Sequence, residues 1–154
     1  FVFLNDTATT EISQSRSSAA SDVYKRQSQQ YPPAIADFNE AIRIKPDYAF
    51  AFNNRGNTYL QLGRYQQAIS DYSEAIRLNP DYARAYYNRG FTYGIHMGRY
   101  ERAIDDLNEA IRRAPDAPDI HLTRGIIYSH IGGPELAASV YYTHLRDHET
   151  PEHL

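Results

Sequence analysis

The 154-residue sequence contains no cysteine, which excludes disulfides and thiolate sites and leaves the redox compartment open. It also has no apolar run near the roughly 20 residues that a membrane-spanning helix needs. Sixteen basic and nineteen acidic residues give a formal net charge of −3, so no strong attraction to nucleic acid or anionic membranes is expected. We therefore expect no nucleic-acid partner, no membrane insertion, and a soluble protein of the cytoplasm.

Motifs of the common enzyme classes are also missing. The sequence has no phosphate-binding Gly-Lys-Ser/Thr loop, no Gly-x-Gly-x-x-Gly and no Gly-x-Ser-x-Gly. Six histidines are present, but His148 to His153 reads HETPEH, which differs in spacing from the zinc motif H-E-x-x-H and contains Pro151. The sequence thus predicts no catalytic residue, no metal site and no cofactor.

The sequence does contain one motif that occurs three times. NRGNTYLQLGRY begins at Asn54, NRGFTYGIHMGRY at Asn88, and a fainter copy, TRGIIYSHIGGP, at Thr123. Small, aromatic and proline residues keep the same period of 34 or 35 residues. These repeat positions are Gly56, Tyr59, Ala68, Tyr72, Ala75 and Pro80, then Gly90, Tyr93, Ala103, Ala110 and Pro115, then Gly125. A fixed period of this length is typical of repeat architectures.

Each unit is predicted to form two helices. Apolar and aromatic residues recur at helical spacing on both sides of Gly63, where a glycine favours the end of the first helix. Pro80 is expected to end the second helix, because proline has no amide hydrogen and clashes with the preceding turn. The small residues Gly56, Ala68 and Ala75 would let the two helices approach closely.

With these residues in place, the chain resembles the tetratricopeptide repeat family over about residues 28–140. The third unit departs from the pattern, since His144 stands where the family has alanine. The resemblance implies an all-α fold, an α-solenoid of stacked antiparallel helix pairs in a right-handed superhelix. It further implies a concave groove that binds peptides or protein segments.

Projecting the family's groove onto this chain selects residues of the first helix of each unit. The candidates are Asn53, Asn54, Asn57, Arg84, Tyr87, Asn88, Phe91 and Thr123, with Phe50, Asp119, Leu122 and Ile126 at equivalent positions. Asparagine carries both a donor and an acceptor, so it suits the backbone of an extended peptide. The alternative is that Asn54 and Asn88 only cap the helix or lie on its solvated face. Chaperone-binding family members clamp a terminal carboxylate with basic residues, whereas Asn53, Asp119 and Thr123 stand at those positions here. That clamp is not expected.

An arginine also recurs one residue before each repeat glycine, at Arg55, Arg89 and Arg124. An aspartate recurs one residue before the aromatic or leucine of the second helix, at Asp37, Asp71 and Asp106. The pattern predicts ion pairs between neighbouring helices. The alternative is a ladder of guanidinium groups that faces a ligand.

The second unit contains one residue more than the first between Tyr93 and Gly98. This extra residue must either widen a helical turn or lengthen the loop, and Gly94 gives the segment freedom to do so.

Both ends of the chain depart from the repeat. The chain starts at Phe1 rather than Met, and NDTATTEI, SSAASDVYKRQ and THLRDHETPEHL resemble translated sequencing-adapter or assembly-derived sequence. We expect residues 1–27 to be non-native or disordered and residues 141–154 to be a non-native tail. Residues 28–140 would then hold the second helix of one repeat, two full repeats and one weaker repeat.

These features predict a non-catalytic protein-interaction module with a protein or peptide partner. The main alternative is a repeat fragment of a larger enzyme or signalling protein whose catalytic domain lies outside this chain. A third hypothesis is self-association through the open ends of the repeat array.

Overall fold

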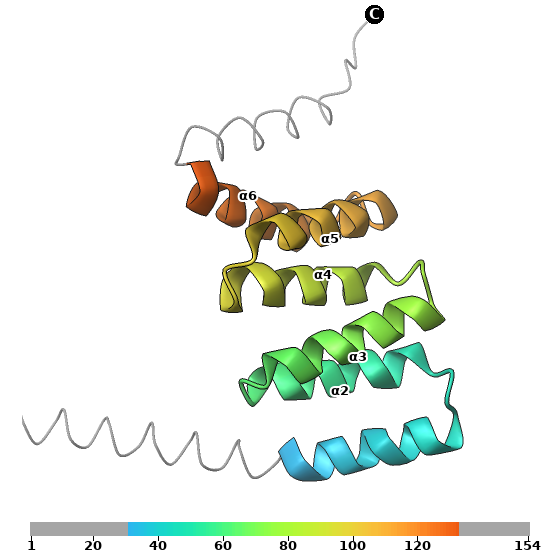
Figure 1. Ribbon diagram of the computed structural model, residues 1–154. Coiled ribbons are helices and arrows are strands. Elements are labelled where there is room, and N and C mark those ends of the chain that lie inside the picture. The colour runs from blue at the N-terminus through green and yellow to red at the C-terminus, as the bar shows by residue number, and fades with distance from the viewer. Residues whose placement is uncertain (1–30, 133–154) are drawn as a thin grey trace, which may run out of the picture.

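The computed structural model describes residues 31–132, and every regular element in that range is a helix (Figure 1). The chain is helical over residues 31–44 and continues with α2 (Ala49–Gln61), α3 (Tyr65–Leu78) and α4 (Ala83–Phe91). A short π-helical segment, η1 (Thr92–His96), directly extends α4. The helices α5 (Tyr100–Arg113) and α6 (Pro118–Gly132) complete the described part.

Consecutive helices run antiparallel and stack in one direction (Figure 1). Helices α2 and α3 form one hairpin, and α4 with η1 forms the next hairpin with α5. Helix α3 also packs on α4, and α5 packs on α6, so each hairpin lies against its neighbour. The predicted all-α fold of stacked antiparallel helix pairs is thus confirmed.

Glycine and proline end the helices as their backbone chemistry requires. Gly63 has a φ of +70°, and the amides of Gly63 and Arg64 donate to the carbonyls of Leu60 and Tyr59 at 3.0 and 2.9 Å. This is the left-handed glycine cap that satisfies the last carbonyls of α2. Helix α3 ends before Pro80, where Asn79 is extended with a φ of −137°. A residue before proline avoids the helical region for steric reasons.

Close helix approach inside each hairpin depends on a glycine. A Cβ added to Gly56 would lie 2.7 Å from Cε1 of Tyr72 and 3.2 Å from the carbonyl oxygen of Ala68. The equivalent atom at Gly90 would lie 3.0 Å from Cβ of Asp106 and 3.1 Å from the carbonyl oxygen of Ala103. For Gly125, no such approach is recorded among the described residues.

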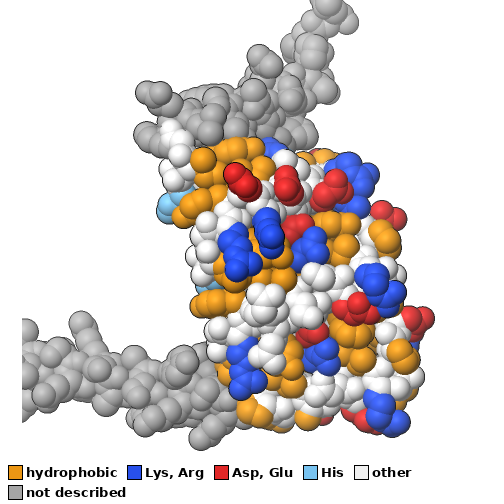
Figure 2. Space-filling model, in the orientation of Figure 1, with side chains coloured by type: hydrophobic (Ala, Val, Ile, Leu, Met, Phe, Trp, Pro, Cys, Tyr) orange, Lys and Arg blue, Asp and Glu red, His pale blue; other side chains and the backbone are white. Residues whose placement is uncertain are grey.

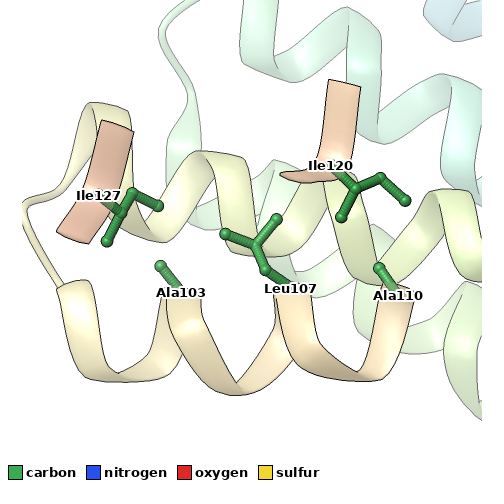
Figure 3. Close-up of a cluster of buried hydrophobic side chains, with 5 residues drawn as sticks. All are labelled: Ala103, Leu107, Ala110, Ile120 and Ile127. Carbon is green, nitrogen blue, oxygen red and sulfur yellow. The ribbon is translucent and has the colours of Figure 1, made fainter. Parts of the chain in front are cut away.

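Buried side chains between α5 and α6 form a compact apolar cluster (Figure 3). Its members are Ala103, Leu107, Ala110, Ile120 and Ile127, and all except Ile120 are completely buried. In the preceding hairpin Ala51, Ala68, Tyr72 and Ala75 are likewise inaccessible to solvent. The buried alanines of the two hairpins occupy equivalent repeat positions, Ala68 with Ala103 and Ala75 with Ala110.

The extra residue of the second unit widens a helical turn rather than lengthening the loop. The amide of Arg99 donates to the carbonyl of Tyr93 at 2.8 Å. The turn that this bond closes is one residue longer than the turn closed by the bond from Arg64 to Tyr59. The π-helical segment η1 accommodates this residue. Gly94 is buried within it, and a Cβ there would overlap the side chain of Ile127 and lie 3.1 Å from Cβ of Ala103. The missing side chain therefore lets the wider turn pack against α5 and α6.

The predictions for residues 1–27 and 141–154 lie outside the described residues, as do the outer parts of the expected 28–140 array. Among residues 31–132, none of the helices combines the length and the apolar character that crossing a bilayer requires.

We predict that Gly56→Ala destabilises the protein by about 1–2 kcal/mol, because overpacking against the buried Tyr72 ring outweighs the higher helix propensity of alanine. Urea unfolding followed by circular dichroism measures this loss. Asn54→Ala, two residues earlier on α2, is the matched control and is expected to retain the wild-type stability. Equal stability of Gly56→Ala and wild type would contradict a tight contact at this position.

Candidate functional site

The first helices of successive units, α2, α4 and α6, share one set of aligned residues. We call this set the first-helix face; its members are Phe50, Asn53, Asn54, Asn57, Arg84, Tyr87, Asn88, Phe91, Asp119, Leu122, Thr123 and Ile126. Side chains 31 to 36 residues apart meet across it. Asn88 bonds to α2, and Arg84 and Tyr87 bond to α6. Of the positions predicted from the repeat, the structure thus joins Asn88 to Asn53 and Asn57, Arg84 to Asp119, and Tyr87 to Thr123.

Three asparagines of the face are hydrogen-bonded to one another. The Nδ2 group of Asn88 donates to Oδ1 of Asn53 at 2.9 Å and to Oδ1 of Asn57 at 3.0 Å. Asn53 is only 2% exposed. The cluster joins α2 to α4, so much of its hydrogen-bonding capacity serves the contact between the two units.

A buried tyrosine ties this amide cluster to the core. The hydroxyl of Tyr72, on α3, donates to Oδ1 of Asn57 at 2.9 Å. Burial raises the pKa of Tyr72 well above its ordinary value, so the phenol stays protonated and remains a donor. Sequence reasoning identified Tyr72 as a packing residue but gave no sign of this bond to the face.

Asn54 and Thr123 occupy the same register position as Asn88 but differ in surroundings. No hydrogen bond of the Asn54 side chain is recorded among residues 31–132, although the side chain is half-buried. Thr123 is almost fully buried; its Oγ1 donates to the carbonyl of Asp119 at 2.8 Å and lies 3.5 Å from Tyr87 Oη. The side chain of Asn54 is therefore not part of the hydrogen-bonded amide cluster.

The charged residues of the face neutralise each other. Arg84 on α4 donates to Asp119 on α6 at 2.7 Å, and both side chains are about half exposed. The guanidinium carbon of Arg84 also lies 5.3 Å from the ring centroid of Tyr87. An ion pair this exposed contributes little to stability, on the order of 0–1 kcal/mol.

Aromatic rings cluster where α4 passes into η1. The ring centroids of Tyr87 and Phe91 are 6.1 Å apart, and Phe91 meets the ring of His96 edge-on at 5.5 Å. His96 also stacks on Tyr65 of the preceding hairpin at 4.8 Å. His130 stacks in the same way on Tyr100, at 5.9 Å. These histidine–tyrosine contacts were missed from the sequence, although both histidines stand near the end of a first helix.

The recurring arginines make ion pairs inside each hairpin. Arg55 holds both carboxylate oxygens of Asp71 at 2.6 and 2.8 Å, and Arg89 holds Asp106 at 2.7 and 2.8 Å. Hydrogen bonding to the aspartate raises the pKa of Arg55 and of Arg89. The predicted ion pairs between neighbouring helices are thus confirmed for these two arginines.

The same arginines also reach the preceding hairpin. Their Nη1 groups donate to the second helix before them, Arg55 to Asn39 at 2.6 Å and Arg89 to Ser73 at 2.9 Å. Arg124 follows the pattern with Asn108 at 2.8 Å, while its buried Nε has no hydrogen-bond partner among the described residues. Each arginine thus links neighbouring units.

Other site chemistry is not evident in residues 31–132. No group of three or more histidine, aspartate or glutamate side chains there could hold a metal ion. A hollow of about 590 Å³ is lined by Gly98–Arg102 and Ile131, and no member of the first-helix face lines it. Figure 2 shows acidic and basic side chains close to one another on the visible face, without a broad field of one sign.

Two family models match the chain. One described as TPR repeat matches residues 22–63 and 56–94, and one described as tetratricopeptide repeat matches residues 83–117. A comparison with curated proteins finds no match.

Several solved structures share the fold. The TPR domain of Arabidopsis OM64 is 26% identical, with a TM-score of 0.62 over 73% of this chain and 97% of that domain. YrrB, described as a TPR protein with an unusual peptide-binding site, is 24% identical with a TM-score of 0.62 over 73% of this chain. MamA from Desulfovibrio magneticus RS-1 is 21% identical with a TM-score of 0.67 over 79% of this chain and 70% of that chain. The chain spans 57% of the length of YrrB.

We predict that Arg89→Met destabilises the protein by about 2–4 kcal/mol, because it leaves Asp106, whose side chain is 9% exposed, without its partner. Arg77→Met is the matched control, since Arg77 pairs with Glu74 at the surface and its loss should cost under about 1 kcal/mol. Chemical denaturation measures both. Equal losses in the two variants would show that burial of the Arg89 pair is energetically unimportant.

We predict that Tyr72→Phe costs about 1 kcal/mol at pH 7, through the lost hydrogen bond to Asn57. Because burial raises the pKa of Tyr72, the tyrosine contributes stability below the ordinary phenol pKa near 10 and loses it as the pH rises further. The stability difference between wild type and variant should therefore shrink above pH 10. Urea unfolding at pH 7, 9 and 10.5 tests this, and a difference that is constant with pH would contradict it.

Proposed function

The chain belongs to the tetratricopeptide repeat family, and on that premise we propose that it acts as a non-catalytic module that binds a segment of a partner protein on the first-helix face. Members of this family are generally protein- or peptide-binding modules and typically are not catalysts. YrrB, which shares the fold, is described as having a peptide-binding site. The mechanism is passive, because stacked helices present side chains that are already in position.

The observation that carries the proposal is that three asparagines of the face bond to one another while a fourth does not. Asn53, Asn57 and Asn88 hold one another in place, which fixes the face before any ligand arrives. Asn54 lies beside this cluster with no side-chain bond recorded among the described residues. A fixed surface that leaves one amide unused suits an extended peptide backbone, since asparagine supplies both a donor and an acceptor.

The recurring arginines Arg55 and Arg89 do not compete with the first-helix face as a binding surface. Arg55 and Arg89 are engaged with aspartates of the second helices and with the preceding units. They stabilise the stack and keep its units aligned. The second helices carry further ion pairs such as Arg77–Glu74, which are solvated surface pairs. The first-helix face thus remains as the surface with varied side chains, some of which have no hydrogen bond or ion pair recorded among the described residues.

We predict that a peptide selected from a random linear library binds the full chain on this face. In NMR titrations, amide shifts should concentrate on the α2, α4 and α6 positions of the face, while the exposed positions of α3 and α5 stay unchanged. Asn54→Ala should weaken the peptide about three- to tenfold without a change in stability, because one hydrogen bond is lost.

Arg77→Ala on α3 is the control and should bind as wild type does. Shifts confined to α3 and α5, together with full affinity in Asn54→Ala, would place the contact on the second helices. Failure of every library peptide to bind the chain would overturn the proposed function.

A further inference from the structure

The first-helix face changes its chemistry along the stack. At two register positions one turn apart, the side chains pass from amide to aromatic to aliphatic. These are Asn53 and Asn57 on α2, Tyr87 and Phe91 on α4, and Leu122 and Ile126 on α6. The two positions share one side of each helix because they are four residues apart. A partner lying across the three helices therefore meets a polar end and an apolar end.

The apolar end is open to solvent. Leu122 is 67% exposed and Ile126 is 41% exposed, although large aliphatic side chains are usually buried. Tyr87 of α4 contacts the same helix through Thr123, and its ring is 6.1 Å from that of Phe91. Leu122 and Ile126 thus lie on the helix that Tyr87 contacts, and they occupy the repeat positions that Tyr87 and Phe91 hold on α4. Exposed aliphatic and aromatic side chains at matching positions have the composition of an anchor site for apolar side chains.

The polar end offers less to a partner than its composition indicates. Both hydrogens of Asn88 Nδ2 are used by Asn53 and Asn57, and Oδ1 of Asn57 also accepts from Tyr72. These groups fix the position of α2 against α4. Affinity must therefore come mainly from the apolar end, where side chains still in water can be buried.

No unpaired cation is present on the first-helix face. Arg84 is its basic residue, and it is bonded to Asp119, the acidic residue of the face. The face is therefore neutral overall. A strongly acidic peptide, or one held by its terminal carboxylate, would have to take Arg84 from Asp119 and would leave that aspartate unpaired.

We propose that the partner is an uncharged segment from within another protein, which seats two apolar side chains against Leu122 and Ile126 beside Phe91. The proposal rests on the proposed function, and it adds which part of the face supplies the affinity and which class of ligand it accepts. Neutrality of the face selects against charged segments, and the exposed aliphatic pair selects for leucine, isoleucine or phenylalanine in the ligand.

The test screens the full 154-residue chain against two display libraries of random ten-residue peptides. In one library the peptides are held at both ends, and in the other the carboxyl end is free. We expect both libraries to yield peptides that carry at least two large apolar residues and few charges. The affinity of a synthetic selected peptide is then measured by fluorescence anisotropy.

Three variants locate the binding. Leu122→Ser should weaken the selected peptide about tenfold or more, as the loss of an apolar anchor contact does. Arg84→Gln should change the affinity less than about threefold. Ile44→Ser removes an equally exposed apolar side chain from the helix at residues 31–44, and it should bind as wild type does. Thermal melts confirm that all three variants remain folded.

The alternative outcomes are distinct. Selection of acidic peptides only from the free-end library, with binding lost in Arg84→Gln, overturns this inference and leaves the proposed function standing. Full affinity in Leu122→Ser does the same. Concentration-dependent dimers in light scattering that vanish in Leu122→Ser identify a second copy as the occupant and also overturn it. Failure of both libraries overturns the proposed function itself.

Discussion

Everything in this structure depends on how closely the two helices of a hairpin approach. At Gly56 and Gly90 the distance is so short that a Cβ would press on a buried side chain and on a backbone carbonyl of the facing helix. Completely buried alanines, Ala68 and Ala103, lie opposite the glycines. This spacing places the arginine beside each glycine within reach of the aspartate on the second helix. Tight packing and the paired charges therefore have one geometric cause.

The arginines Arg55 and Arg89 also hold each hairpin against the helix that precedes it. Each uses one side of its guanidinium for an aspartate in its own hairpin and a further nitrogen for the hairpin before it. The planar fork of arginine suits this double role, whereas a lysine would supply only a point charge. The stability of a repeat array includes the free energy of each interface between adjacent units. A bond between hairpins contributes to this interface free energy as well as to the hairpin in which it lies.

The face proposed to bind a partner is not separate from this framework. Tyr72 belongs to the core, yet its hydroxyl reaches Asn57, and Asn57 shares a donor group of Asn88 with Asn53. The polar end of the face is thus held by the packing beneath it. Leu122 and Ile126 at the other end stay exposed. The same repeat position therefore serves assembly in one unit and stays exposed to solvent in another.

Much of the fold could be read from the sequence, because period and backbone sterics are local properties. The repeated period predicted two helices in each unit, Gly63 and Pro80 predicted where these helices end, and the extra residue after Tyr93 predicted either a wider turn or a longer loop. Its form as a π-helical turn needed the structure, because the space left by Gly94 against Ile127 comes from a distant helix. The choice between ion pair and ligand contact for Arg89 was likewise open until Asp106 was seen beside it. Asparagine side chains can bond in many directions, so only the tertiary structure decided which amides are used internally and which side chains remain exposed.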